Sequence, residues 1–546
     1  MSTRYFSPIL LLCLFLMPAA DLQAEQLLIQ LDKPFYTAGD PMAYQLFFPK
    51  SFQGKNLALK VALYHPDGQV VTEHFLKTDG KLGANGHLKI PYDLPSQAYH
   101  WLLLGTQKDG KERVKLGELL LPIYNDLSTA PAPTQLPTLA PNGKPSSQLS
   151  VDLKLLNRET NRGDKVQAMI AVQDQAGQGV DGTLSITVKD ASLLSMGTDR
   201  ELSTYHLSMP DGVAELLSEE IHILGQSFEL DGQTFQSAIL CAYIREENQF
   251  FCTNSESDGR FSLVLPEIQG MRHIQFMDYQ RSDLKVKLSD NISLNSGVRT
   301  DTKPSLATYL NWSRLRKKIY QFYGTIESPI NAIPGKLKAE IFKPDQRFVM
   351  AEYTPFEDLT IFFNEIVTPF KLREKGKRGY VARMFNPTQQ IRQFYKGSPV
   401  FIVDGHLTKD ASFIYRIPIE KIDTIDLYFY PQSLQPKFGP ISNSGMVIIK
   451  TSLNQLDLPT TDANNIFTVS LLKESFARSE MAAEAQEQVK IGPNLLWLAD
   501  QVISPAGTYQ LDFQHGDDLG TFLIEIAVQS KEGQTATYTQ YYEVAK

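Results

Sequence analysis

Apolar and polar residues alternate along the first part of the chain. Between residues 26 and 125 the alternation recurs in short runs, as at Met42, Tyr44 and Leu46. A period of two places successive side chains on opposite faces of a strand. Asp-Gly and Asn-Gly pairs, which favour tight turns, separate the runs. The pattern predicts antiparallel strands in a β-sandwich over residues 25–127.

A proline-rich stretch without periodicity follows at 128–148, and its composition predicts an extended linker. The alternation then resumes. A Gly-Asp pair precedes it at Gly163, as another does at Gly39 in the first module, so the two openings form a weak internal repeat. We predict a second sandwich over 149–220.

Two strand-like runs joined by a polar segment hold the two cysteines that follow residue 24, Cys241 and Cys252. A hairpin centred between Glu246 and Glu247 places these cysteines opposite each other, close enough for a disulfide. The alternative is a pair of reduced thiols in a core. An even cysteine count is typical of an oxidising compartment. We predict the disulfide, within a third β unit over 221–300.

A helical pattern occupies part of the next segment, 301–349. It predicts a connector helix from Ser305, as cap, to Tyr323, with Gly324 as the stop. The helix carries a basic cluster that is either a site for an acidic partner or a solvated helix face. The cluster comprises Arg314, Arg316, Lys317 and Lys318.

The pattern changes to mixed α and β over 350–452. The sequence Thr354-Pro-Phe-Glu357 predicts a capping box that opens a helix, and Pro369 ends it. Strand-like runs follow at 399–405 and 445–451. The last segment, 453–546, again shows strand-like runs separated by turn residues, which predict a C-terminal sandwich.

The first 24 residues predict a secretory signal peptide. Arg4 precedes an apolar run from Ile9 to Met17, and small residues end at Ala24. The run is about half the ~20 residues that a membrane-spanning helix needs, so we expect an exported chain that is not an integral membrane protein. The net charge of −8 does not favour binding to nucleic acid or to an anionic membrane surface.

The sequence offers little chemistry. No two of the nine histidines have zinc-motif spacing on a helix, and no Gly-x-Ser-x-Gly elbow occurs. We therefore predict no catalytic, metal-ligating or cofactor-binding residue and no enzyme. Three short motifs have a competing structural interpretation as turns. They are Gly105–Lys111, which is similar to a phosphate-binding loop but is followed by Glu112, the tripeptide Arg162-Gly-Asp164, and Asp404 with His406 as an acid–base pair.

Two segments resemble known modules. Leu31–Asp40 is similar to the opening strand of a macroglobulin-type domain of the alpha-2-macroglobulin family, and Ser185–Leu194 looks like a further macroglobulin-type or immunoglobulin-like sandwich. The Gly-Cys-Gly-Glu-Gln thioester sequence of that family is missing. Asp258, Gly259 and Phe261 resemble the turn of a carboxypeptidase regulatory-like sandwich. The resemblance implies a mostly β chain of tandem immunoglobulin- or macroglobulin-like sandwiches plus one α+β domain.

That α+β domain resembles the plug of TonB-dependent outer-membrane receptors. The matching positions are Asp404 and Gly405 after a strand, Phe438-Gly439 in a turn, and Gly445 before a strand, and we expect them to be structural. No short energy-coupling box is found. A receptor barrel needs about 22 strands of roughly 10 residues. Only 95 residues follow Thr451, so we expect no transporter.

These observations favour a non-catalytic interaction or scaffold protein of the cell envelope, in the periplasm or on the outer membrane, without a cofactor. Its expected partner is a protein of the outer membrane or envelope. The alternative is a macroglobulin-like endopeptidase inhibitor without a thioester. That function would need an exposed bait segment, and the linker at 128–148 is the candidate.

Overall fold

A computed structural model describes most of the chain, and the fold is mostly β as predicted. The described residues are 25–128, 133–139, 148–156, 160–198, 202–235, 237–280, 284–322, 343–376, 379–453, 456–472, 493–516 and 518–545. The predicted signal peptide, residues 1–24, lies outside them and stays a prediction.

The first sandwich packs a sheet of order β14-β1-β3-β6 against one of order β2-β8-β7-β4-β5. Alternating apolar residues fill the space between the sheets, with Tyr44, Tyr99 and Trp101 at the centre. β14 and the short helix α2 come from the segment assigned to the second sandwich, so the first module extends beyond its predicted end. The bounds are β1 Gln26–Leu31, β2 Tyr36–Thr37, β3 Pro41–Phe47, β4 Ala58–Tyr64, β5 Val70–Lys77, β6 Gly83–Lys89, β7 Gln97–Thr106, β8 Arg113–Tyr124, β14 Thr204–Ser208 and α2 Val213–Leu216.

The predicted second and C-terminal sandwiches, 149–220 and 453–546, are wrong as separate units. Their strands form the two sheets of one sandwich, of orders β10-β12-β31 and β11-β33-β32-β13-β30. β13 pairs with β32 from Gly182–Ser530 to Asp190–Phe522. Alternation shows which side chains face a core but not which strands are neighbours, so each half alone has the pattern of a complete sandwich. The bounds are β10 Leu149–Leu155, β11 Thr160–Asn161, β12 Lys165–Asp174, β13 Gly182–Asp190, α1 Ala191–Leu194, β30 Asn494–Ile503, β31 Thr508–Gln514, β32 Gly520–Ser530 and β33 Thr535–Ala545.

The third sandwich also takes a strand from a distant part of the chain. Its sheets have orders β18-β15-β20 and β17-β16-β19-β29, and β29 lies far beyond the predicted unit 221–300. β29 covers the edge of β19 and adds Val469 to the core. The bounds are β15 Ile221–Glu229, β16 Ile239–Ile244, β17 Gln249–Asn254, β18 Arg260–Leu265, β19 Met271–Asp278, β20 Leu284–Leu288, α7 Thr460–Asn464 and β29 Ile466–Ser470.

The connector helix α3 spans Leu306–Phe322 and begins after Ser305, as predicted, whereas its predicted end at Tyr323 and stop at Gly324 lie outside the described residues. The Ser305 hydroxyl donates to the Met196 carbonyl at 3.0 Å. Two residues of the basic cluster find an acidic partner within the chain, because Arg316 pairs with Asp40 and Lys317 with Asp126. The helix is thereby attached to the first sandwich.

The described part of the predicted linker is not free. β9, Gln135–Thr138, pairs antiparallel with β21, Val298–Asp301. Leu136 of β9 is buried in a small cluster with residues of α3 and the first sandwich. The remaining linker residues, 129–132 and 140–147, lie outside the described residues.

The mixed module covers residues 343–453. Its sheet has the order β22-β27-β28-β25-β26, in which β25 and β28 are parallel, and a hairpin β23-β24 lies beside it. Its helix α4 begins four residues later than the predicted capping box requires, because Asp358 is the cap and accepts from the Ile361 N–H at 3.0 Å. The bounds are β22 Gln346–Val349, α4 Leu359–Glu365, β23 Phe370–Glu374, β24 Tyr380–Met384, β25 Val400–Val403, β26 His406–Thr408, α5 Ala411–Arg416, β27 Ile422–Tyr428, α6 Pro431–Phe438 and β28 Met446–Thr451.

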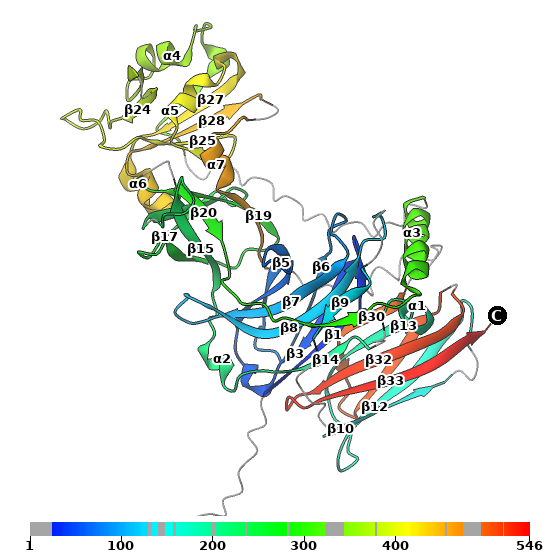
Figure 1. Cartoon of the computed structure of the whole chain (residues 1–546). Helices are drawn as coiled ribbons and strands as arrows, with labels where there is room; N and C mark the ends of the chain where they lie inside the picture. Colours follow the sequence, from blue (N-terminus) through cyan, green and yellow to red (C-terminus); the bar gives the residue numbers. More distant parts are fainter. Residues whose placement is uncertain are drawn as a thin grey trace, which may run out of the picture.

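The modules form a chain in space that does not follow their order in the sequence. The mixed module lies at one end, the third sandwich connects it to the first, and the two-part sandwich with the C-terminus lies at the other end (Figure 1). The N-terminal strands therefore lie in the middle of the molecule.

A buried ion pair of the two-part sandwich lies at its contact with the first sandwich. Lys189 and Glu525 form the pair, with side chains 0% and 1% exposed. Glu525 also accepts from the Ser203 N–H at 3.1 Å and from the Thr204 hydroxyl, both beside β14. Burial alone would raise the pKa of Glu525, but the Lys189 ammonium and these hydrogen bonds hold it below its usual value.

We expect Lys189→Met to lower the free energy of unfolding by about 3–5 kcal/mol, because it leaves the Glu525 carboxylate buried without its partner. The double variant Lys189→Met/Glu525→Leu should recover much of this loss. Lys531→Met, which removes a surface pair with Asp181, is the control and should change nothing. Urea denaturation measures all three. Equal loss in the single and the double variant would contradict the argument.

Candidate functional site

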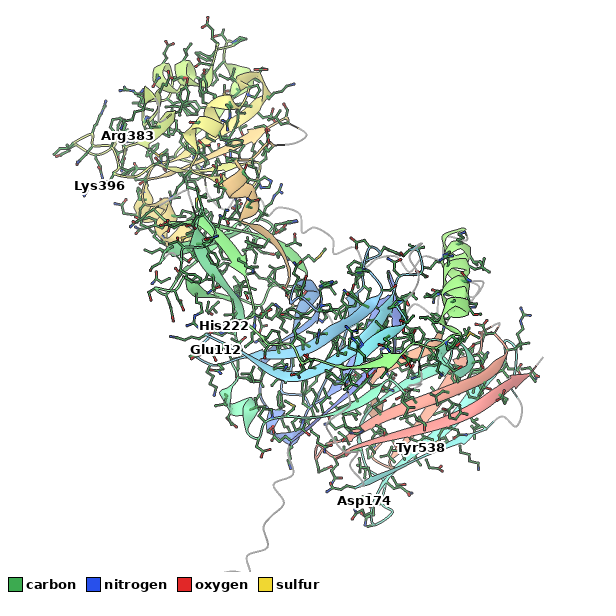
Figure 2. The ribbon with its side chains drawn as sticks, in the orientation of Figure 1. Glu112, Asp174, His222, Arg383, Lys396 and Tyr538 are labelled. Atoms are coloured by element: carbon green, nitrogen blue, oxygen red, sulfur yellow. A yellow bond between two sulfur atoms is a disulfide. The ribbon has the colours of Figure 1, made fainter. Side chains whose placement is uncertain are left out.

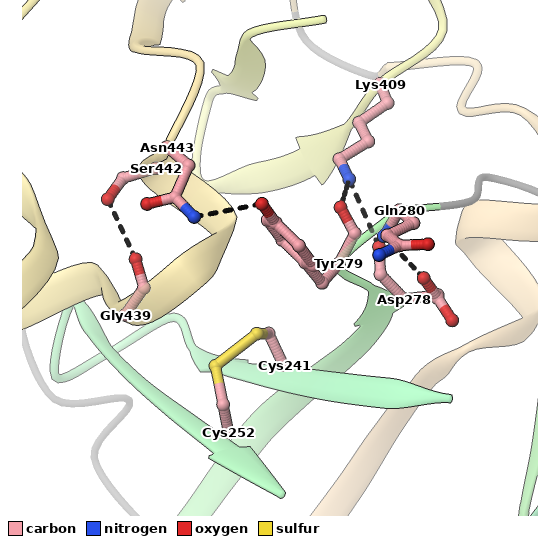
Figure 3. The surroundings of a disulfide bond; sticks show 9 residues. All are labelled: Cys241, Cys252, Asp278, Tyr279, Gln280, Lys409, Gly439, Ser442 and Asn443. Atoms are coloured by element: carbon pink, nitrogen blue, oxygen red, sulfur yellow. Dashed lines mark hydrogen bonds between the residues drawn. A yellow bond between two sulfur atoms is a disulfide. The ribbon is translucent and has the colours of Figure 1, made fainter. Parts of the chain in front are cut away.

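The mixed module packs against the hairpin that holds the disulfide. Cys241 on β16 lies directly opposite Cys252 on β17, and the two sulfur atoms are bonded (Figure 3). The register is that expected from a turn centred between Glu246 and Glu247. Cys241 is buried, whereas Cys252 at the edge of the sheet is exposed.

Apolar side chains from both modules form one continuous cluster beside the disulfide. The Phe250 ring of the hairpin meets the Phe438 ring of α6 edge to face, with centroids 5.1 Å apart. Gly439 follows with a φ of 61°, and a Cβ there would lie 3.2 Å from the Cys252 sulfur. The cluster comprises Cys241, Tyr243, Phe250 and Met277 of the third sandwich with Val400, Ile402, Leu407, Tyr428, Leu434, Phe438, Ile441 and Met446 of the mixed module.

Gln275 makes two hydrogen bonds across this interface. Its side-chain amide donates to the Leu407 carbonyl and accepts from the Leu407 N–H, both at 2.7 Å. Gln275 and Leu407 are both buried. Because the Gln275 side chain bonds both the N–H and the carbonyl of Leu407, it takes the place of a neighbouring strand at the edge of β26. No sequence motif marks this residue.

Asp404 and His406 do not form an acid–base pair. The Asp404 carboxylate accepts from the Thr451 N–H at 2.8 Å and its hydroxyl at 2.6 Å, and Asp404 and Gly405 both have positive φ in the turn after β25. His406 Nε2 lies 3.3 Å from Arg245. Burial and the nearby guanidinium lower the pKa of His406. Both residues serve the turn and the interface.

Of the other predicted motif positions, Phe438 and Gly439 contact the hairpin, and Gly445 immediately precedes β28. Gly445 has a φ of 84°, and a Cβ there would lie 2.3 Å from the Met384 sulfur. The five positions therefore make turns and packing contacts, and they do not come together to form a chemical site. They are Asp404, Gly405, Phe438, Gly439 and Gly445.

The remaining candidate motifs also lie in turns. Gly110, with a φ of 73°, turns the chain between β7 and β8, and the Lys111 N–H donates to Asp109 at 3.0 Å. Gly163, with a φ of 74°, lies in a turn that Asp164 closes by accepting from the Asn161 N–H at 2.8 Å. Among the described residues no group of three or more His, Cys, Asp or Glu side chains could hold a metal ion.

A cleft opens beside the disulfide, between the end of β19 and the mixed module. Its volume is about 580 Å³, and Lys409 lies in its wall. Burial lowers the pKa of Lys409 to about 8, against the opposing effect of the Asp278 carboxylate. No sequence motif marks this cleft, because its walls come from three separated segments, 279–280, 395–409 and 441–444.

Comparison with known proteins returns only distant similarity. No family model matches the chain, and no curated protein matches it. Among solved structures, native Escherichia coli alpha-2-macroglobulin matches at 10% identity with a TM-score of 0.24, over 96% of this chain and 40% of that one. Salmonella alpha-2-macroglobulin reacted with methylamine matches at 8% identity with a TM-score of 0.25, over 96% and 39%.

The chain thus spans about two fifths of the length of these bacterial proteins. At such TM-scores the similarity assigns no function. Within the described part of the chain, no helix has the length and apolar character needed to cross a membrane.

Alkylation tests the disulfide directly. We expect the intact mass of the mature protein to be unchanged after denaturing alkylation without reductant, and to gain two labels after reduction. Two labels without reductant would contradict the bond between Cys241 and Cys252.

We expect Gln275→Leu to loosen the interface. It leaves the buried N–H and carbonyl of Leu407 without partners, at a cost of roughly 1–3 kcal/mol for each group. Hydrogen exchange of residues 406–408 should become faster. Gln249→Leu, at an exposed position of β17, is the control. Unchanged exchange in Gln275→Leu would show that the amide does not hold β26.

Proposed function

We propose that the protein is a non-catalytic interaction protein of the cell envelope, in which the mixed module contacts a protein partner and the sandwiches hold it in place. The observation that carries this proposal is the way in which the mixed module packs against the third sandwich. One of its faces is buried on the disulfide hairpin, whereas α4 and the β23–β24 hairpin point away from every other module (Figure 1).

The loop between β24 and β25 supplies a suitable contact surface. Its residues 388–394 are all exposed, and they include Ile391 at 79% and Phe394 at 39%. Loops carried on a rigid scaffold are common binding elements. The ring of Phe394 packs edge to face on Phe385, with centroids 5.2 Å apart, which fixes the loop to the module. Arg383 and Lys396, near either end of this loop, lie on the outer side of the module (Figure 2).

The nature of the partner follows from the sequence. The signal-peptide pattern at 1–24 supports export, and the resemblance of 350–452 to a receptor plug supports a partner at the outer membrane. The buried interface supports a module that is held in one orientation, and such preorganisation lowers the entropic cost of binding.

A photo-crosslinking amino acid at position 391 tests the proposal in the native envelope. We expect it to link the protein to an envelope protein. The matched control is position 502, where Val502 of the two-part sandwich is 75% exposed. Equal crosslinking from both positions, or none from 391, would count against the mixed module as the contact surface.

The alternative function predicted from the sequence, endopeptidase inhibition, makes a different prediction. A protease would cut the linker, and its activity on large substrates would then fall. In the described part of the linker, Gln135–Thr138 is paired with β21. A bait would therefore have to lie in 129–132 or 140–147. Cleavage there without loss of protease activity would reject inhibition.

A further inference from the structure

The cleft beside the disulfide has the composition of a site for an anion. It is lined by Lys396 and Lys409, whereas none of the described residues that line it is an aspartate or a glutamate. Its volume of about 580 Å³ lies within the range of roughly 300–1,000 Å³ that is typical of small-molecule sites. It lies where two modules meet, which is a common place for such sites.

Lys409 is held in the wall of the cleft. Its ammonium donates to the Asp278 carbonyl at 3.2 Å and to the Tyr279 carbonyl, and it lies 5.7 Å from the centroid of the Tyr279 ring (Figure 3). An ammonium has three donors, so one remains for a ligand. Holding a partly buried lysine costs free energy that an apolar residue would avoid. A bound anion would offset this cost.

Neutral polar groups and aromatic rings complete the cleft. Among the described residues, the side chains of Ser398 and Ser444 have no hydrogen-bond partner, so their hydroxyls are open to a ligand. Asn443 is fixed, because its amide donates to the Tyr279 hydroxyl at 2.9 Å. The Tyr395 hydroxyl donates to the Phe429 carbonyl at 2.7 Å, which orients a second ring at the cleft.

We propose that this cleft binds the carboxylate of an acidic sugar. The two lysines match a carboxylate, the serine and asparagine groups match the hydroxyls of a sugar, and the tyrosine rings match its apolar C–H face. No arginine is among the described residues that line the cleft, so the bidentate contact common in phosphate sites is not provided. The cleft shares Tyr395–Ser398 with the loop between β24 and β25, but the exposed residues 388–394 that are proposed to contact a protein do not line it.

Titration calorimetry of the mature chain with D-glucuronate, D-glucose and acetate tests the proposal. Glucose lacks only the carboxylate of glucuronate, and acetate lacks the ring. We expect glucuronate to bind at least about tenfold more tightly than either, because each loses one of the two kinds of contact. No binding of glucuronate, or equal binding of glucose, would overturn the proposal. Equal binding of acetate would overturn the sugar specificity and leave a plain anion site.

Two variants test whether the ligand binds in the cleft. Lys409→Met should weaken glucuronate binding about tenfold, as should Lys396→Gln, since each removes a charged hydrogen bond. Lys396 is exposed and makes no bond to another described residue, so its replacement does not threaten the fold. Lys375→Gln, on the exposed hairpin of the same module, is the control and should bind as the original chain does. Binding unchanged in both Lys396→Gln and Lys409→Met would overturn the assignment.

The pH dependence supplies a separate readout. A lysine with a pKa of about 8 is mostly charged at pH 7 and mostly neutral at pH 9. Glucuronate affinity should therefore fall by about tenfold over this interval. In Lys409→Met the fall should disappear. Affinity that is flat with pH in the original chain would contradict a role for Lys409.

Discussion

The closure of one sandwich by two distant stretches of chain is the constraint on which the rest of the structure depends. β13 lies between β30 and β32, so the apolar faces of 149–190 stay uncovered until 494–545 arrives. The chain between residues 190 and 494 must therefore leave this sandwich and return to it. The entropic cost of such a closure grows only slowly with loop length. A long excursion is therefore acceptable when it folds into modules of its own.

The third sandwich repeats this arrangement on a smaller scale. Its strand β29 pairs with β19 only after the chain has passed through the whole mixed module. The mixed module is thus an insertion within an insertion. Modules joined in this way are free to move relative to each other unless a large apolar interface fixes them. The cluster around the Cys241–Cys252 disulfide and the two hydrogen bonds of Gln275 provide that interface.

Buried charges hold the other junctions. Asp290, which follows the third sandwich, pairs with Lys60 at 2.6 Å and with Arg113 at 2.8 Å in the first. Burial would raise the pKa of Asp290, but the two cations hold it well below its usual range. Pairs of this kind add little net stability and are costly when broken. Their positions at Lys189, Lys60 and Arg316, all at contacts between modules, fit a role in fixing orientation.

Local features of the fold could be predicted from the sequence, and its connections could not. The hairpin register of Cys241 and Cys252 follows from two runs of residues and one turn, and α3 follows from its own pattern. The pairing of β13 with β32 spans more than 300 residues, and alternation carries no information about the neighbour of a strand. Lys409 was missed for the same reason. A lysine beside a turn has no motif, and the pKa of Lys409 is lowered by burial against the third sandwich, in spite of the opposing Asp278 carboxylate. A site formed between nested modules therefore becomes visible only when the nesting is known.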